Sequence, residues 1–408
     1  MNVRFRLAVL AAWVLGMQCW QQSATAAEEP QVRPAPAAAA KADEPIDFER
    51  ARGLLQKRRA GERLTPQEEA YLQRALEARR RGQGPRPVPP ANLMRDTSAL
   101  KPLTEMTADD RYKDEDGGLY GQGSSAPPPE HAKAAQAALS AIQPLDKEGK
   151  PASDGKIVLV SLSMSNATQE FSTFKRLADA DSAKSPRVLV VDCAQGGQAM
   201  AEWAPPDARP WTEALRRIEA AGADPRQVQA AWVKLANKMP RGDLKEHGQK
   251  LRDDTVALLR NAKARFPNLR IAYLSSRIYG GYATTPLNPE PYAYESAFVV
   301  RWLIRDQIAG DKEHNAQADH GPVKTPLLLW GPYLWANGTT PRKADGLTYA
   351  REDLAGDGTH PSGSGREKVA GLLLEFFKTD PLARPWFAPR RQPAEGLPGE
   401  APAGGSNR

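Results

Sequence analysis

Short, almost continuously apolar runs alternate with longer amphipathic stretches through the central and C-terminal parts of the chain. Five apolar runs have the length of strands, and they cover residues 157–160, 188–191, 228–233, 271–274 and 327–330. Apolar side chains recur at helical spacing over residues 168–180, 246–265, 294–308 and 364–377. Strands without polar alternation are typical of a parallel sheet that helices cover on both faces. The pattern therefore predicts an α/β fold, a three-layer α/β/α sandwich with a mainly five-stranded parallel sheet.

A separate helical hairpin is predicted over residues 46–82, ahead of this domain. Asp47 can cap the first helix. Thr65 and Glu68 have the spacing of a capping box, with Pro66 at the first position of a second helix that carries an apolar stripe. We expect this hairpin to be a small spacer or packing element in preference to a binding module.

Proline-rich segments divide the remainder of the chain. Residues 28–45 are rich in Pro and Ala, and residues 83–130 and 389–408 are rich in Pro and Gly. We predict a flexible linker at 28–45, an extended linker at 83–130 that can lie against the main domain, a main domain at 131–388 and a disordered tail at 389–408.

Residues 1–27 are typical of a secretory signal peptide. Arg4 and Arg6 precede an apolar run over residues 7–17, and small residues at 24–26 supply a cleavage site. An uncleaved anchor is the alternative, although the run is short for a membrane-spanning helix. Removal of this segment leaves Cys193 as the only cysteine, so no internal disulfide is expected. We predict a secreted or bacterial periplasmic protein with no spanning segment after signal removal.

The formal net charge of +7 is concentrated in one segment. Residues 49–86 hold eleven Arg or Lys against five Glu, and the rest of the chain is near balance. No basic and aromatic RNA-binding motif accompanies them, so we expect no nucleic-acid partner and suggest contact between the hairpin and a polyanion. The chain also lacks paired histidine spacing for zinc and a dinucleotide-binding glycine motif, so no metal or cofactor is expected.

Candidate catalytic side chains follow the predicted strands, at the edge where parallel sheets bind their ligands. Asp357 stands three residues before His360, at the start of the last predicted helix. Asp357 can orient His360, which can then act as a general base toward a hydroxyl. Ser163 and Ser165, directly after the first strand, supply two candidate hydroxyls. The structural alternative is that these serines only cap the following helix.

The loops after three other strands add polar groups. Gly197 permits close approach of the backbone to a ligand, and the side-chain amide of Asn237 can donate to an oxyanion. Arg277, Tyr279 and Tyr282 stand among glycines, a composition that suits a polar ligand such as a sugar. Taken singly, each residue is explained as well or better by an ordinary turn or strand end. Their joint occurrence after successive strands indicates a site.

This order of loops resembles the SGNH hydrolase superfamily, the GDSL-type esterases and lipases, over residues 155–380. Asp357 and His360 match the terminal D-x-x-H motif of that family, Gly197 falls at the glycine of its second motif, and Asn237 falls at the asparagine of its third. The resemblance implies a flavodoxin-like sheet and a Ser-His-Asp mechanism that requires no metal.

The other motif positions depart from the family pattern. Ser163-Met164-Ser165 stands where the family has Gly-Asp-Ser, Asp192 stands at a usual asparagine, and Leu235 replaces a usual glycine. The nucleophile is therefore open between Ser163 and Ser165. Ser165 is favoured because it holds the third position of the motif, immediately before the helix.

By the same resemblance, His360 would take the proton of Ser165 while Asp357 holds the imidazole in the required tautomer. The backbone amides of Ser165 and Gly197, with the side chain of Asn237, would form the oxyanion hole. We expect Ser165 Oγ to lie within hydrogen-bonding reach of His360.

Three functions are compatible with these features. The leading expectation is an exported serine esterase that hydrolyses a small ester, with acetylated carbohydrate as the candidate substrate. A non-catalytic glycan-binding protein on the same fold is the alternative, supported by the altered first motif. A surface protein whose basic hairpin binds a polyanionic polymer is the third.

Overall fold

A computed structural model of the chain describes residues 45–59, 63–80 and 96–389. The chain divides into two compact units, Met1–Arg86 and Pro87–Arg408, and each is described by itself. The predicted signal peptide lies outside the described residues, as do the predicted first linker and C-terminal tail except for residues 45 and 389. Within the described ranges, no helix has both the length and the apolar character needed to cross a bilayer.

The larger unit is built on one five-stranded sheet. Its strands are β1 (Ile157–Ser161), β2 (Val188–Asp192), β3 (Val228–Lys234), β4 (Ile271–Ser275) and β5 (Leu327–Trp330). They pair in the order β2-β1-β3-β4-β5, and every pairing is parallel. All five strands come from the apolar runs of the sequence, so the predicted α/β class and parallel sheet are confirmed.

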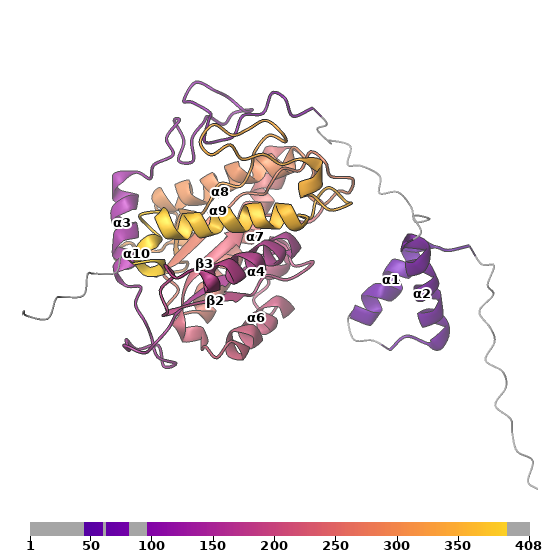
Figure 1. Ribbon diagram of the computed structural model, residues 1–408, viewed down its shortest axis with the longest axis horizontal. Coiled ribbons are helices and arrows are strands. Elements are labelled where there is room, and N and C mark those ends of the chain that lie inside the picture. Colours follow the sequence, from indigo (N-terminus) through magenta and orange to yellow (C-terminus); the bar gives the residue numbers. More distant parts are fainter. Residues whose placement is uncertain (1–44, 60–62, 81–95, 390–408) are drawn as a thin grey trace, which may run out of the picture. The chain divides into compact units, whose positions relative to one another are not determined.

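Helices flank this sheet (Figure 1). Those of the larger unit are α3 (Pro129–Ser140), α4 (Ser165–Ala180), α5 (Met200–Trp203), α6 (Arg209–Ala220), α7 (Leu244–Arg265), α8 (Tyr292–Ile308), α9 (Gly363–Thr379) and α10 (Arg384–Phe387). The connection from β1 to β2 runs in the opposite direction along the sheet from the later connections. Because such crossovers are right-handed, α4 lies on one face while α6, α7 and α8 lie on the other. Accordingly, α4 packs beside α9, and α7 packs beside α8.

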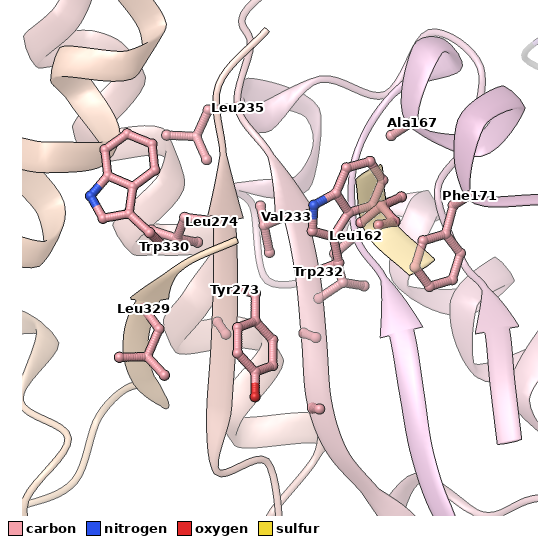
Figure 2. Packing of buried hydrophobic residues seen from close by; sticks show 14 of the residues in the cluster. Leu162, Ala167, Phe171, Trp232, Val233, Leu235, Tyr273, Leu274, Leu329 and Trp330 are labelled. Carbon is pink, nitrogen blue, oxygen red and sulfur yellow. The ribbon is translucent and has the colours of Figure 1, made fainter. Parts of the chain in front are cut away.

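Aromatic side chains fill the space between the sheet and α4. The rings of Phe171 and Trp232 stack with centroids 5.5 Å apart, which joins α4 to β3. Figure 2 shows this pair, with Tyr273 on β4 and Trp330 on β5 farther along the sheet. Burial of one such side chain stabilises the fold by about 1.5–3 kcal/mol. This packing holds the strand ends, and the loops that follow them, in fixed positions.

Part of the predicted linker at 83–130 belongs to the larger unit. Leu103 and Met106 are buried in its core. The ring of Tyr112 stacks on Phe298 of α8, with centroids 5.4 Å apart. Arg301 of α8 also pairs with carboxylates of this segment. The described residues from 96 onward therefore pack as part of the domain, and the unit begins before the predicted boundary at 131.

Four helices of the larger unit were not predicted, namely α3, α6 and the four-residue helices α5 and α10. Helix α3 buries only His131, Ala135 and Leu139, so its apolar stripe is too sparse to stand out in a proline-rich region. Helix α6 buries Trp211 and Ile218 at helical spacing. That pattern is visible in the sequence, but three arginines within the helix mask it.

The smaller unit is a helical hairpin of α1 (Phe48–Arg59) and α2 (Pro66–Arg80). The predicted capping box is present, because Thr65 N donates to Glu68 Oε2 at 2.8 Å and Glu68 N donates to Thr65 Oγ1 at 3.2 Å. Asp47 Oδ1 accepts from Arg50 N at 3.2 Å, as expected of the first cap. A small apolar core includes Tyr71 and joins the two helices.

Candidate active site

A chain of hydrogen bonds joins three side chains that are far apart in the sequence. Ser165 is the first residue of α4 and follows the turn after β1. Its Oγ lies 2.7 Å from His360 Nε2. The other ring nitrogen, His360 Nδ1, lies 2.5 Å from Asp357 Oδ2. The contact expected between Ser165 and His360 is therefore present, and it has the serine–imidazole–carboxylate order of an acyl-transfer site.

The loop that carries Asp357 and His360 is held by its own backbone. Asp357 Oδ1 accepts from the amides of Thr359 and His360, both at 3.0 Å. Burial favours the protonated carboxyl, but the hydrogen bonds from the His360 ring and these amides outweigh it and hold the pKa of Asp357 well below its usual value. The carboxylate therefore stays ionised and can stabilise a protonated imidazole.

Two further contacts fix this loop against its surroundings. Gly358 has a φ of +65°, and a Cβ at this position would lie 1.8 Å from the carbonyl oxygen of Tyr282. Only glycine fits there without distortion. Asn166 of α4 donates through Nδ2 to Thr359 O at 2.8 Å, so the helix that presents Ser165 is tied directly to the histidine loop.

Ser163 lies in a different environment from Ser165. It is fully buried, and its Oγ donates to Lys234 O of β3 at 2.5 Å. The hydroxyl therefore faces the sheet, and not the imidazole. Of the two serines left open by the sequence, the structure brings only Ser165 next to His360.

Ser165 and His360 open into a cavity of about 260 Å³. Gly197, Asn237 and Arg277 also line it, so segments that follow all five strands meet there. A second hollow, of about 400 Å³, lies beside α7 and α8 and is lined by charged side chains. We assign the site to the smaller cavity because it alone of these two contains the hydrogen-bonded serine and histidine.

Three residues that line this cavity carry candidate hydrogen-bond donors. The first amides of a helix have no acceptor within the helix, and Ser165 begins α4. Gly197 has a φ of +75° and open space around its Cα. Asn237 accepts at Oδ1 from Ala201 N at 2.9 Å and donates through Nδ2 to Asp254 Oδ2 at 2.6 Å. Because an amide nitrogen carries two hydrogens, one hydrogen of Asn237 is left for the cavity.

Asp192, at the position where the sequence resemblance expects an asparagine, has a structural role. Its carboxylate accepts hydrogen bonds from Ser161 Oγ at 2.6 Å and from Thr168 Oγ1. These contacts join β1, β2 and α4 beneath the turn that presents Ser165. Burial raises the pKa of Asp192, and the hydrogen bonds from both hydroxyls oppose that shift.

The structure does not bring the two predicted substrate-binding tyrosines into the cavity. Tyr279 is buried, and its hydroxyl lies 3.0 Å from Thr97 Oγ1. Tyr282 donates to Tyr349 O at 3.3 Å. Both hydroxyls have partners within the loops around the site and neither tyrosine lines the cavity, so the structure does not support substrate binding by these two residues. Of that predicted set, Arg277 alone lines the cavity.

Several cavity residues were missed from the sequence. Asn166 follows Ser165 directly, and its position at the start of a helix was a usable signal. Lys238 and Asn288 also line the cavity. Asn288 comes from the loop before α8 and donates to Asn237 O. No local motif points to Asn288, because only folding brings it beside the third strand. In the part of the chain that the structure describes, no group of three His, Cys, Asp or Glu side chains is arranged to hold a metal ion.

Comparisons with known proteins find only distant likenesses. No protein-family model and no curated protein matches the chain. A solved structure from Bacteroides fragilis, proposed to be an acylhydrolase, matches at a TM-score of 0.32 and 12% identity, over 60% of this chain and 93% of its own. A gut microbial diltiazem-metabolizing enzyme matches at 0.31 and 15%, over 54% and 46% of the two chains. The periplasmic domain of a lipopolysaccharide acetyltransferase from Salmonella ser. Paratyphi A matches at 0.30 and 10%, over 59% and 92%.

Proposed function

We propose that this protein is a serine esterase of the SGNH type, with Ser165 as nucleophile, His360 as general base and Asp357 as the residue that orients the imidazole. The observation that carries the proposal is the continuous contact from Ser165 Oγ to His360 Nε2 and from His360 Nδ1 to Asp357 Oδ2. A helix cap would account for one serine, but not for its contact with a carboxylate-bound histidine.

In the proposed reaction, Ser165 Oγ attacks the ester carbonyl carbon while His360 Nε2 accepts the hydroxyl proton. The carbonyl oxygen becomes an oxyanion, which the amides of Ser165 and Gly197 and the side chain of Asn237 stabilise. The imidazolium then protonates the departing alcohol, and the acyl group remains on Ser165. A water molecule, deprotonated by His360, attacks the acyl-enzyme and releases the acid.

A cavity of about 260 Å³ suits a small acyl group with part of its alcohol. The predicted signal peptide favours export to the periplasm or outside the cell, where acylated carbohydrates are candidate substrates. We therefore propose an exported enzyme that hydrolyses a small ester, with an acetylated carbohydrate as its candidate substrate.

The test is covalent labelling of the full chain with a fluorophosphonate probe, followed by mass spectrometry of the modified peptide. We expect labelling at Ser165, loss of labelling in Ser165→Ala and His360→Ala, and retained labelling in the matched control Ser163→Ala. Labelling at Ser163 would overturn the assignment of the nucleophile. No labelling, together with no turnover of acetyl esters, would overturn the esterase and favour the glycan-binding alternative.

A further inference from the structure

Arg277 places a buried positive charge in the wall of the cavity. It lies on the loop after β4, only 3% of its surface is exposed, and it lines the same cavity as Ser165. Its backbone amide donates to Ser296 Oγ of α8 at 2.9 Å, which anchors the residue at its main chain. A guanidinium stays protonated in proteins, so the side chain carries its charge at this position.

The other buried cations of the described residues all have carboxylate partners. Lys234 pairs with Glu170 at 2.6 Å, and Arg301 and Arg342 likewise pair with neighbouring aspartates. Arg277 differs, because within the described ranges no carboxylate oxygen lies within 4.0 Å of its guanidinium. Its Nε is also buried without a hydrogen-bond acceptor.

The carboxylates whose charge reaches Arg277 are those of Glu170, Glu290 and Asp357, and each is already engaged. Both oxygens of Glu170 accept from Lys234. Glu290 accepts from Trp335 Nε1 and from two backbone amides. Asp357 is bound by the histidine loop. None of them is free to turn toward the guanidinium.

An unpaired charge inside a protein is expensive, because neither water nor a counterion compensates for its lost hydration. Such a charge is retained where a ligand supplies the missing partner. Guanidinium groups bind planar anions through parallel hydrogen bonds, and carboxylates fit that geometry. The open side of Arg277 is the cavity that holds Ser165 and His360.

We propose that Arg277 binds a carboxylate carried by the ester substrate, so that the preferred substrates are anionic esters. This inference rests on the proposed function, since it names the substrate class of the same site. The carboxylate belongs either to the acyl group, as in a half-ester of a dicarboxylic acid, or to the alcohol, as in an acylated acidic sugar. Because both share the cavity with the scissile bond, the carboxylate lies close to the reacting carbonyl.

Matched pairs of esters test the proposal and separate the two sources of the carboxylate. 4-Nitrophenyl hydrogen glutarate against 4-nitrophenyl pentanoate places the charge on the acyl side. 4-Acetoxybenzoate against its methyl ester places it on the alcohol side. We expect kcat/KM to favour the charged member of one pair by about tenfold or more, as for a charge-assisted hydrogen bond. Arg277→Gln should abolish that preference, so that kcat/KM becomes similar for the two members of the pair.

Two further variants sharpen this test. Arg277→Lys keeps the charge without the paired geometry and should restore the preference only in part. Arg216→Gln removes an equivalent charge from an exposed position on α6 and should leave the preference intact. Equal kcat/KM for both members of both pairs, with no change in Arg277→Gln, would overturn the inference.

A binding measurement distinguishes failure of this inference from failure of the esterase. In the Ser165→Ala background, millimolar glutarate or benzoate should raise the melting temperature, and the added substitution Arg277→Gln should remove that shift. If the fluorophosphonate probe labels Ser165 but neither the rise in melting temperature nor the preference for charged esters appears, the proposal for Arg277 is wrong and the proposed esterase is retained. If the anions raise the melting temperature but the probe labels no serine, the proposed esterase is wrong and Arg277 still binds an anion.

The melting temperature of an apolar variant distinguishes an arginine that binds a ligand from one that only stabilises the fold. Replacement of a buried, unpaired charge by an apolar side chain of similar volume is neutral or stabilising. We therefore expect Arg277→Met to fold with an unchanged or higher melting temperature. A clear fall in the melting temperature would show that Arg277 holds the fold together, and would count against a role in ligand binding.

Discussion

Ser163 and Ser165 stand two residues apart, yet their hydroxyls meet different groups because Ser163 lies in the turn after β1, whereas Ser165 is already the first residue of α4. Ser163 still faces the sheet and donates to Lys234 O of β3. Ser165 begins α4 and reaches His360. One turn of backbone therefore separates a buried structural hydroxyl from one that lines the cavity.

We expect Ser165→Ala to lower kcat for a small ester by roughly 10⁴-fold or more, because the proposed nucleophile is lost and His360 has no hydroxyl left to deprotonate. Ser163→Ala should keep most of the activity and lower stability by about 1 kcal/mol, since it removes one buried hydrogen bond. Steady-state kinetics and denaturant unfolding measure the two effects. Similar losses of activity in both variants would contradict the separation of roles.

The carboxylate of Asp357 links stability to pH. Its pKa in the folded protein is depressed, so its contribution to stability is complete above the unfolded value near 3.8 and is lost as the pH falls toward the folded value. We expect Asp357→Asn to be less stable than the parent protein at pH 6, and the gap between them to narrow below about pH 4. Thermal unfolding across this pH range measures the difference. A difference in stability between the two proteins that stays constant from pH 6 to pH 3 would show that the carboxylate is not preferentially ionised in the folded state.

At the scale of secondary-structure elements, the site depends on the junctions at which strands end and helices begin. Helix α4 presents Ser165 at its first residue, and α9 begins three residues after His360. Asn166 of α4 donates to Thr359 O, so these two junctions are held together by a direct hydrogen bond. The two helices also pack side by side on one face of the sheet, which limits their relative movement.

Gly358 is a position in this junction where a side chain cannot be accommodated without distortion. Gly358→Ala places a Cβ against the carbonyl oxygen of Tyr282 at a φ of +65°. We expect a loss of stability of about 1–3 kcal/mol and a large fall in activity, because the loop that carries His360 must move. The matched control is Gly371→Ala, in the exposed part of α9 with open space around its Cα, which should be stabilising by up to about 1 kcal/mol. Equal effects of the two substitutions on activity would contradict the importance of the loop.

At the scale of the whole molecule, the segment that precedes the sheet is part of the larger unit, whereas the hairpin is a unit of its own. The segment from residue 96 onward contributes Leu103 and Met106 to the main core. The hairpin has its own small core around Leu54 and Leu72 and forms a separate compact unit.

Two truncated chains test whether the hairpin and the segment from residue 96 contribute to the stability of the larger unit. A chain that begins at Pro87 should keep the melting temperature of the larger unit and the esterase activity, because it retains the whole packed core. A chain that begins at Pro129 should be strongly destabilised, since loss of each large buried side chain costs about 2–5 kcal/mol. Calorimetry and ester turnover compare the two proteins. If removal of the hairpin alone abolished activity, the hairpin would have to take part in the site.

The alternation of apolar runs and helical stripes determined the α/β class, all five strands and the main helices, because burial of both faces of a parallel sheet leaves a strong local pattern. The motif spacing also identified Asp357 and His360 as a pair, since three residues suffice to bring them into contact. A capping box such as that of Thr65 and Glu68 is equally local and was predicted for the same reason.

The sequence favoured Ser165, but only the tertiary structure showed that Ser165, and not Ser163, contacts His360. Only the tertiary structure gave the hydroxyls of Tyr279 and Tyr282 partners outside the cavity and placed Asn288 in its wall. It also showed that the charge of Arg277 is unpaired. These properties depend on which distant groups surround a side chain after folding. The local sequence determines which residue stands at a position and which backbone conformation it prefers. Long-range packing determines the partners of its side chain, how far the side chain is buried and whether it lines a cavity.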